Sequence, residues 1–201
     1  KKPEPVIPTA ETTTGLKYSI RHFYVTDNST MANPPQWLKQ SQEKLARLQQ
    51  KLSRMELGSK NYAEGVQKYR LLHEHIANQR WDFLHKESSR IANGWDAVCM
   101  RGDSMREISQ RAMPGNALEA GFGTFRDLLR YKLERQGKQL IIVDRYVPTT
   151  RICSACGNVR EAVHHKEYVW SCSSCGAVHN TEVNAARNIK AQGLAQYTKG
   201  A

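Results

Sequence analysis

The sequence lacks several features that mark large classes of protein. None of its apolar runs reaches the roughly eighteen residues that a membrane-spanning helix needs, so we expect no membrane partner. No secretory signal peptide is visible. Acidic residues are scarce beside basic ones, 19 against 30, which leaves a formal net charge of +11. This excess favours a polyanionic partner, DNA or RNA, and an incidentally basic surface is the alternative.

Arrangements typical of nucleophilic catalysis are also missing, so we expect no serine, cysteine or histidine nucleophile. The seven histidines are scattered along the chain, and a lone histidine is more often a surface or capping residue than a catalyst. They include His73, His75, His85, His164, His165 and His179.

The 201 residues, 39% of them hydrophobic, suffice for one substantial core and a smaller module. The sequence begins Lys1-Lys-Pro without an initiator methionine, and we expect it to be part of a longer polypeptide. Residues 1–14 are rich in proline and threonine, which predicts a linker or an extended entry into the fold.

Two cysteine pairs form the most specific motif. Each pair has two residues between its cysteines and a glycine directly after the second one: the first pair is Cys153 and Cys156, and the second is Cys172 and Cys175. Fifteen residues separate Cys156 from Cys172. This spacing predicts a structural zinc site with four thiolates, which leave the ion no open position. Residues 161–170 are expected to form a hairpin that brings the pairs together. Two disulfides are the alternative, and His164 and His165 could in principle enter the site, although four cysteines already fill it.

Periodicity and turn residues predict alternating strands and helices. Cys99 lies in an apolar run and is expected in the core, residues 106–118 read as a loop, and Thr181 is a candidate N-cap. Inward-facing stripes are expected at Phe125, Leu128, Leu129 and Leu133, and at Val183, Ala186 and Ile189. The expected elements are a β-hairpin over 14–26, helices at 36–55 and 63–92 that form an antiparallel pair, buried strands at 95–100 and 139–143, and helices at 123–136 and 181–191.

Together these features resemble a known family. The matching segments are residues 58–62, 75–86, 125–137 and 183–189, with the four cysteines. The resemblance as a whole covers nearly all of residues 14–194. The chain resembles the C-terminal, RuvC-type half of TnpB, the RNA-guided nuclease of bacterial insertion sequences. The resemblance implies an α/β fold, an RNase H-like mixed sheet with an inserted helical hairpin and a zinc ribbon. The implied domains are a linker at 1–14, a RuvC-like domain at 15–150 with its helical insertion at about 36–93, the ribbon at 151–178, and a last helix and tail at 179–201.

An active RuvC centre holds Mg²⁺ with three carboxylates. The resemblance places those positions at Lys17, Arg101 and Glu182, so two acids are replaced by cations. This pattern is similar to that of the TldR proteins, the nuclease-dead repressors related to TnpB. It implies an RNA-guided DNA-binding protein with no nuclease activity and no catalytic Mg²⁺, which represses transcription by blocking RNA polymerase. The implied partners are a guide RNA and double-stranded target DNA, and the implied location is the bacterial cytoplasm, at the nucleoid when bound to DNA.

Three other interpretations stay open at the level of sequence. One is an active RNA-guided endonuclease that draws carboxylates from Asp27, Asp103, Asp144 or Glu182. Another is a decayed transposon remnant, and the last is a zinc-ribbon DNA-binding module that needs no guide. Basic residues that we expect to contact nucleic acid are Lys60, Arg80, Lys86, Arg151, Arg160, Lys166, Arg187 and Lys190.

Overall fold

A computed structural model describes residues 3–19, 21–33, 36–104, 121–161 and 168–200 of the chain. The chain divides into two compact units. Unit 1 comprises Lys1–Asn33 and Glu87–Ala201, and unit 2 comprises Pro34–Lys86. The predicted loop at 106–118 lies outside the described residues.

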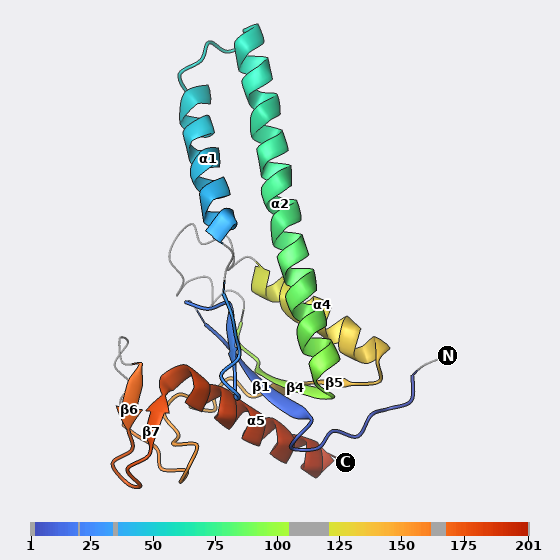
Figure 1. Ribbon diagram of the computed structural model, residues 1–201, viewed down its shortest axis with the longest axis vertical. Coiled ribbons are helices and arrows are strands. Elements are labelled where there is room, and N and C mark those ends of the chain that lie inside the picture. Colours follow the sequence, from blue (N-terminus) through green and yellow to red (C-terminus); the bar gives the residue numbers. More distant parts are fainter. Residues whose placement is uncertain (1–2, 20, 34–35, 105–120, 162–167, 201) are drawn as a thin grey trace. The chain divides into compact units, whose positions relative to one another are not determined.

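Unit 1 is built on a mixed five-stranded sheet with the order β3-β2-β1-β4-β5 (Figure 1). β1 pairs antiparallel with β2 and parallel with β4, and β4 pairs parallel with β5. The predicted hairpin and both later strands are therefore confirmed. The strands are β1 (Thr13–Tyr18), β2 (Tyr24–Thr26), β3 (Met31–Ala32), β4 (Ala97–Arg101) and β5 (Gln139–Val143).

Helix α5 (Thr181–Gly200) packs against one face of this sheet, along β1, β4 and β5 (Figure 1). Glycines permit the close approach. A Cβ added at Gly15 would meet the carbonyl oxygen of Ala186, and one at Gly193 would meet the sulfur of Cys99. Because side chains alternate across a strand and Gly15 pairs with Cys99, both residues point toward α5. Cys99 is fully buried there, as predicted, and burial raises the pKa of its thiol to about 12.

We predict that Gly15→Ala destabilises unit 1 by about 2–3 kcal/mol, because the helix backbone cannot move away from a new methyl group without losing its other contacts. The added Cβ would also lie 2.8 Å from the backbone nitrogen of Lys190. Gly94→Ala is the matched control, since nothing lies within 4 Å of its added Cβ. Urea unfolding of both variants measures the difference, and an equal effect at the two glycines would contradict this packing.

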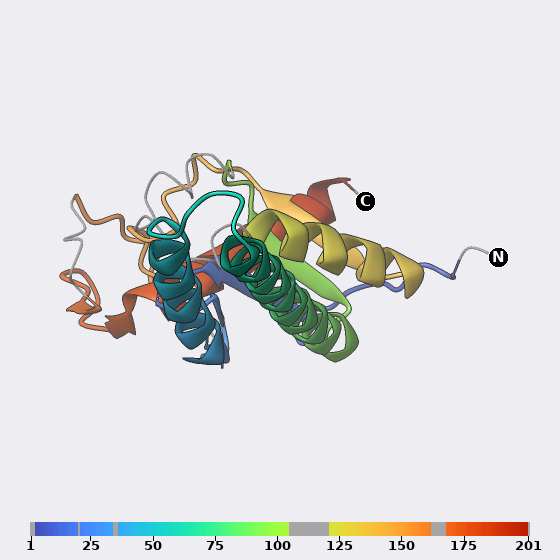
Figure 2. The same cartoon turned by 90° about the horizontal axis from the view of Figure 1, so that it is seen from above.

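Helix α4 (Gly121–Arg135) contacts β5 on the opposite side of unit 1 (Figure 2). An aromatic cluster packs beneath this helix. Phe23 stacks on Phe122 with ring centroids 4.7 Å apart and meets Phe125 edge-on at 5.1 Å. The predicted inward stripe of α4, from Phe125 to Leu133, is buried as expected.

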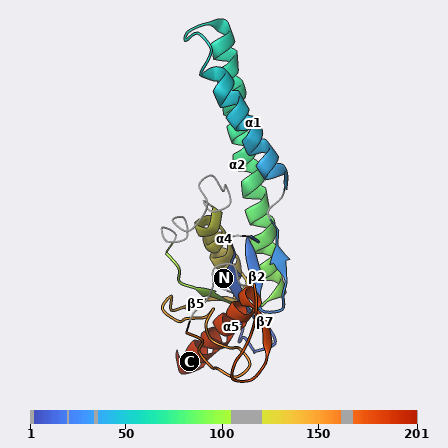
Figure 3. The same ribbon diagram turned by 90° about the vertical axis from the view of Figure 1, so that its left-hand side faces the viewer.

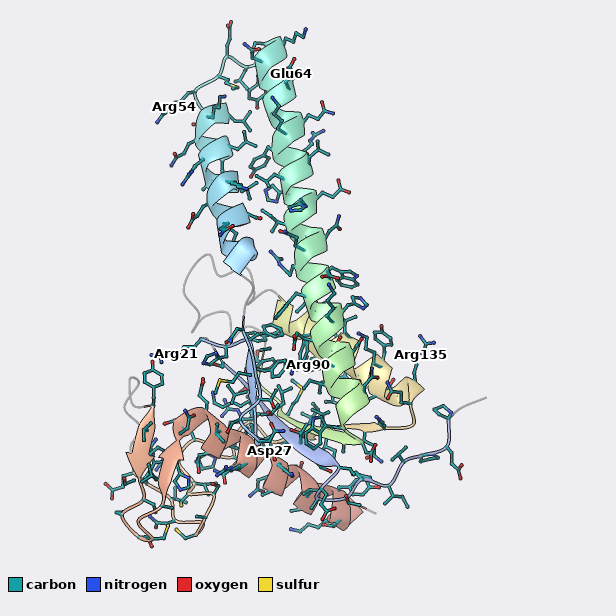
Figure 4. All side chains as sticks on the ribbon, viewed as in Figure 1. Arg21, Asp27, Arg54, Glu64, Arg90 and Arg135 are labelled. Atoms are coloured by element: carbon teal, nitrogen blue, oxygen red, sulfur yellow. The ribbon has the colours of Figure 1, made fainter. Side chains whose placement is uncertain are left out.

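A polar network around buried Tyr24 joins this cluster to the end of helix α2. The hydroxyl of Tyr24 donates to Glu87 at 2.6 Å and accepts from Arg90 at 2.6 Å, and Arg90 also pairs with Glu87 at 2.6 Å (Figure 4). Each polar group of the network therefore has a charged or hydroxyl partner, which removes most of the cost of burying the Tyr24 hydroxyl.

Unit 2 holds helix α1 (Gln36–Leu52) and most of helix α2 (Lys60–Gly94), which run next to each other in Figure 1 and overlap in the view of Figure 3. Ser41 near the start of α1 donates a hydrogen bond to Gln79, at 3.2 Å, and a Cβ on Gly65 would touch the side chain of Leu52 at the other end. These contacts confirm the predicted antiparallel pair. No helix in the described ranges is both long and apolar enough to cross a membrane.

The structure corrects three local predictions. Capping contacts at the start of α5 are made by Asn180, one residue before the predicted cap, Thr181. The side chain of Asn180 accepts hydrogen bonds from the backbone N–H groups of Glu182 and Val183 at 3.0 and 3.2 Å, which makes it the cap. The helix also continues to Gly200, well beyond the predicted end at 191. Strand β5 is less buried than expected: Val143 is buried, whereas Ile142 is 40% exposed.

Candidate functional site

The four cysteines of the paired motif meet at one point. Their Sγ atoms all lie within 4.8 Å of one another, and the Cys153–Cys175 and Cys156–Cys172 distances are both 3.7 Å. Four sulfurs at about 2.3 Å from a tetrahedral zinc ion would be about 3.8 Å apart, which matches these distances. A disulfide needs about 2.05 Å, and all five cysteines are free thiols. The geometry therefore fits a four-thiolate metal ion rather than two disulfides.

Each cysteine pair sits in a tight turn. The N–H of Gly157 donates to the carbonyl of Cys153, the N–H of Gly176 donates to that of Cys172, both at 2.9 Å, and the two glycines have φ values of 78° and 71°. A side chain would strain that left-handed conformation. Most of the hairpin expected at 161–170 lies outside the described residues. The second turn joins β6 (Val169–Ser171) to the antiparallel strand β7 (Val178–Asn180).

The turn at Cys172 also favours the thiolate form that a metal requires. Backbone N–H groups of Cys175 and Ser174 donate hydrogen bonds toward the sulfur and lower the pKa of Cys172 to about 6. Cys153 and Cys172 are buried with Trp170, while Cys156 and Cys175 are exposed. Only one edge of the four-cysteine cluster therefore faces solvent.

Two asparagines of α5 attach the four-cysteine cluster to the sheet domain. Asn184 accepts a hydrogen bond from the N–H of Ser154 at 2.9 Å and donates to the carbonyl of Ile152 at 2.7 Å. Asn188 donates to the carbonyls of Thr149 and Ile152 at 2.8 and 2.7 Å. Sequence reasoning missed these roles. The signal was available, since two asparagines four residues apart lie on one face of a helix.

The three positions that resemble the RuvC carboxylates converge at the same end of α5. The parallel register pairs Leu16 with Met100, so Lys17 and Arg101 follow on adjacent strands and point to the α5 face. Lys17 Nζ lies 3.9 Å from the carboxylate of Glu182 in the first turn of α5. Arg101 pairs with Asp103 instead, at 2.6 Å. We call Lys17, Arg101, Asp103 and Glu182 the charge cluster.

The charge cluster contains two cations and two carboxylates, and it is mostly removed from water. Side-chain exposures are 24% for Lys17 and 18% for Glu182, and 23% for Arg101 and 14% for Asp103. Burial lowers the pKa of Lys17, and the nearby Glu182 carboxylate opposes this shift. Lys17 also donates to the carbonyl of Tyr18 at 2.9 Å. The cluster therefore balances its charges internally.

We predict a coupling energy of about 1 kcal/mol between Lys17 and Glu182 in a double-mutant cycle. Lys17→Met leaves a half-buried carboxylate without its ammonium partner, so this variant loses stability. Adding Glu182→Gln removes the unpaired charge and recovers most of the loss. Urea unfolding of the four proteins at pH 7 measures the coupling. Strictly additive effects would mean that the ion pair contributes nothing.

The other carboxylates considered as catalytic candidates have structural contacts. Asp27 accepts hydrogen bonds from the hydroxyl of Thr14 and the N–H of Gly15, at 2.7 and 3.0 Å, and pairs with Lys190 at 3.0 Å (Figure 4). It thus connects β1 to α5. The carboxylate of Asp144 accepts a hydrogen bond from the backbone N–H of Tyr146 at 3.0 Å, within a turn.

Several of the basic residues expected to contact nucleic acid are engaged within the chain. Lys190 binds Asp27, Arg187 donates to the Asp27 carbonyl at 3.3 Å, and Lys86 pairs with Asp82 at 2.7 Å. Arg151 donates to the carbonyl of Arg160 at 2.8 Å, and the guanidinium of Arg160 lies 4.2 Å from the Trp170 ring. Lys60 is exposed and Arg80 is half-buried, both in unit 2, and Lys166 lies outside the described residues.

Two family models match the chain. The model described as "Probable transposase" matches residues 2–100, and the "Cas12f1-like, TNB domain" model matches residues 122–189. A Streptomyces pristinaespiralis protein named "Putative RNA-guided DNA endonuclease" is 31% identical over 94% of this chain and 47% of its own length. The CRISPR-associated endodeoxyribonuclease Cas12f1 of Sulfoacidibacillus thermotolerans is 36% identical over 59% of this chain and 28% of its own length. The chain spans about half the length of the Streptomyces pristinaespiralis protein and of a second curated relative from Escherichia coli.

Solved structures share the fold. A cryo-EM structure of a Cas12f1–sgRNA–target DNA complex aligns with a TM-score of 0.63 and 19% identity, over 94% of this chain and 40% of the other. A CRISPR–Cas12f ternary complex aligns with a TM-score of 0.65 and 17% identity over the same shares.

Proposed function

Family models, curated relatives and structural neighbours all support a place for this chain in the TnpB/Cas12f-like family, and we propose that it is a nuclease-inactive, RNA-guided DNA-binding protein that represses transcription. The observation that carries the proposal is the charge cluster, where Lys17 and Arg101 occupy positions that resemble those of metal-binding acids. In this proposal the fold is RNase H-like, and the four cysteines hold a structural zinc ion.

Electrostatics supports the absence of a catalytic Mg²⁺. Two unit charges about 4 Å apart interact by about 4 kcal/mol at an effective dielectric of 20, and replacing an acid by a cation turns that attraction into repulsion. Protonated Lys17 and the guanidinium of Arg101 offer no lone pair to a metal ion. The remaining carboxylates, Glu182 and Asp103, are each paired with one of these cations.

The binding function would survive this loss. A guide RNA reads the target by base pairing, while the protein contacts backbones and shape, so recognition needs no carboxylate centre. The net charge of +11 suits that role. A stably bound complex on a promoter would then exclude RNA polymerase.

RNA bound to the purified protein tests the guide-dependent part of the proposal. We expect one discrete RNA species to co-purify, and its guide segment to match the genomic sites that the protein occupies. Promoters at those sites should gain transcription when the protein is deleted. Occupancy that survives removal of the RNA would contradict the proposal and favour a guide-independent DNA-binding module.

A further inference from the structure

His179 lies beside the four-cysteine cluster without belonging to it. It is the central residue of β7, pairs with Trp170 across the hairpin, and is 5% exposed. Its ring packs on that of Trp170, with centroids 4.8 Å apart. The backbone thus holds the imidazole in one place against the buried side of the cluster.

The contact that His179 makes is specific. Its Nε2 atom lies 3.1 Å from the Sγ atom of Cys153, the most buried of the four cysteines. A metal-bound cysteine is a thiolate and carries no proton, so a hydrogen bond between these atoms must take its proton from Nε2. The imidazole is therefore a donor to sulfur here.

A donor at this place has a clear electrostatic task. Four thiolates around one divalent ion carry a formal net charge of −2, and Cys153 and Cys172 are taken out of water with Trp170. Water can hydrate the exposed sulfurs of Cys156 and Cys175, but it has little access to Cys153. The N–H of His179 replaces that missing hydration, and the guanidinium of Arg160 over the Trp170 ring adds positive charge nearby.

The same bond connects the cluster to α5. His179 directly precedes Asn180, which caps α5. Glu182 of the charge cluster lies in the first turn of that helix. Cys153 is flanked by Ile152 and Ser154, which Asn184 binds. The first cysteine turn is thus held from two sides, by the helix and by the strand that leads into it.

We propose that His179 is a positioning residue that donates a hydrogen bond from Nε2 to the Cys153 thiolate and thereby strengthens and protects the bound metal ion. This inference rests on the metal site of the proposed function but is independent of guide RNA and of DNA. Removing an outer-sphere partner of this kind typically weakens metal affinity about 10–100-fold.

The test compares His179→Phe, His179→Gln and the unmodified chain. Phenylalanine keeps a ring against Trp170 but has no donor, whereas the glutamine amide can place an N–H near the position of Nε2. His75→Phe is the control, because His75 is exposed in unit 2. Zinc affinity is measured by competition with a chromophoric chelator, and cobalt(II) substitution reports the sulfur-to-metal charge-transfer bands.

We expect His179→Phe to bind zinc 10–100-fold more weakly and to shift the charge-transfer bands to longer wavelength, because a thiolate without its hydrogen bond donates more charge. His179→Gln should restore both properties toward those of the unmodified chain, and His75→Phe should leave both unchanged. Equal affinity and identical bands for His179→Phe and the unmodified chain would overturn the role of His179 alone. An unmodified chain that takes up no zinc would overturn the metal site and this inference together, and would leave guide-dependent DNA binding to be judged by its own experiment.

Discussion

Removal of the zinc ion proposed at the four cysteines is expected to unfold residues 151–161 and 168–180 while the five-stranded sheet stays folded. Strands β6 and β7 have three residues each, too few for an isolated hairpin to be stable in water. Structural zinc contributes about 10–16 kcal/mol to the folding of small zinc-finger peptides, far more than the packing around Trp170 can supply. The sheet keeps its own core, which includes Leu16, Met100 and Leu129.

Hydrogen exchange with and without a strong chelator measures this effect. Protection should be lost over residues 151–161 and 168–180 and weakened at the first turn of α5, where Asn184 loses its partners at Ile152 and Ser154. Cys172→Ser should mimic the chelator, because three thiolates leave the ion with an open position. Cys99→Ala is the control, since Cys99 lies outside the four-cysteine cluster and its loss should leave one zinc per chain. Full protection after complete metal loss would show that these residues fold without the metal ion.

Introducing acids at the charge cluster is expected to create a site for divalent ions there, and the proposed inactive centre predicts that the unmodified chain binds none at that place. The combined change Lys17→Asp and Arg101→Glu would place four carboxylates together, with Glu182 and Asp103 already present. Their mutual repulsion should destabilise the metal-free variant by several kcal/mol, given about 4 kcal/mol for each close pair of charges at an effective dielectric of 20. Mn²⁺ or Mg²⁺ should then raise its melting temperature.

Thermal unfolding at increasing concentrations of Mn²⁺ or Mg²⁺ measures the rise in melting temperature of this variant. A ligand at 100 times its dissociation constant stabilises a protein by about 2.7 kcal/mol, so a saturable shift of several degrees is expected. Lys86→Asp with Arg130→Glu is the control, because it makes the same charge change at exposed helix positions. The control and the unmodified chain should show no saturable shift. A matching shift in the unmodified chain would mean that its cations do not exclude a metal ion.

Much of the fold followed from local patterns, because the elements are strongly periodic. The stripe from Phe125 to Leu133 and the stripe of Val183, Ala186 and Ile189 both predicted the buried helix faces that the structure has. Alternation along β1 and β4 also brings Lys17 and Arg101 to one face once the parallel register is known. The cysteine spacing predicted the cluster, since knuckles of this kind aim their sulfurs at one point.

Contacts between distant segments were not predictable in this way. The sequence predicted only a turn at Asp27, yet its side chain binds Thr14, Gly15 and Lys190. No local sequence pattern indicates a bond between residues that are 163 positions apart, as Asp27 and Lys190 are. Asn180 and Thr181 are both good caps by residue type, and only the backbone entry into α5 decides between them. The role of His179 likewise depends on the pairing of β7 with β6, which places it next to Cys153.

The most direct test of an inactive nuclease centre is Mg²⁺-dependent cleavage of a matched double-stranded target by the protein loaded with its co-purified RNA. Binding of that target in the same reaction serves as the positive control. The charge cluster predicts stable binding with no cleavage above a reaction that lacks protein. Target cutting that requires Mg²⁺ and disappears in Glu182→Gln would contradict it, because it would place a working metal site beside Lys17 and Arg101.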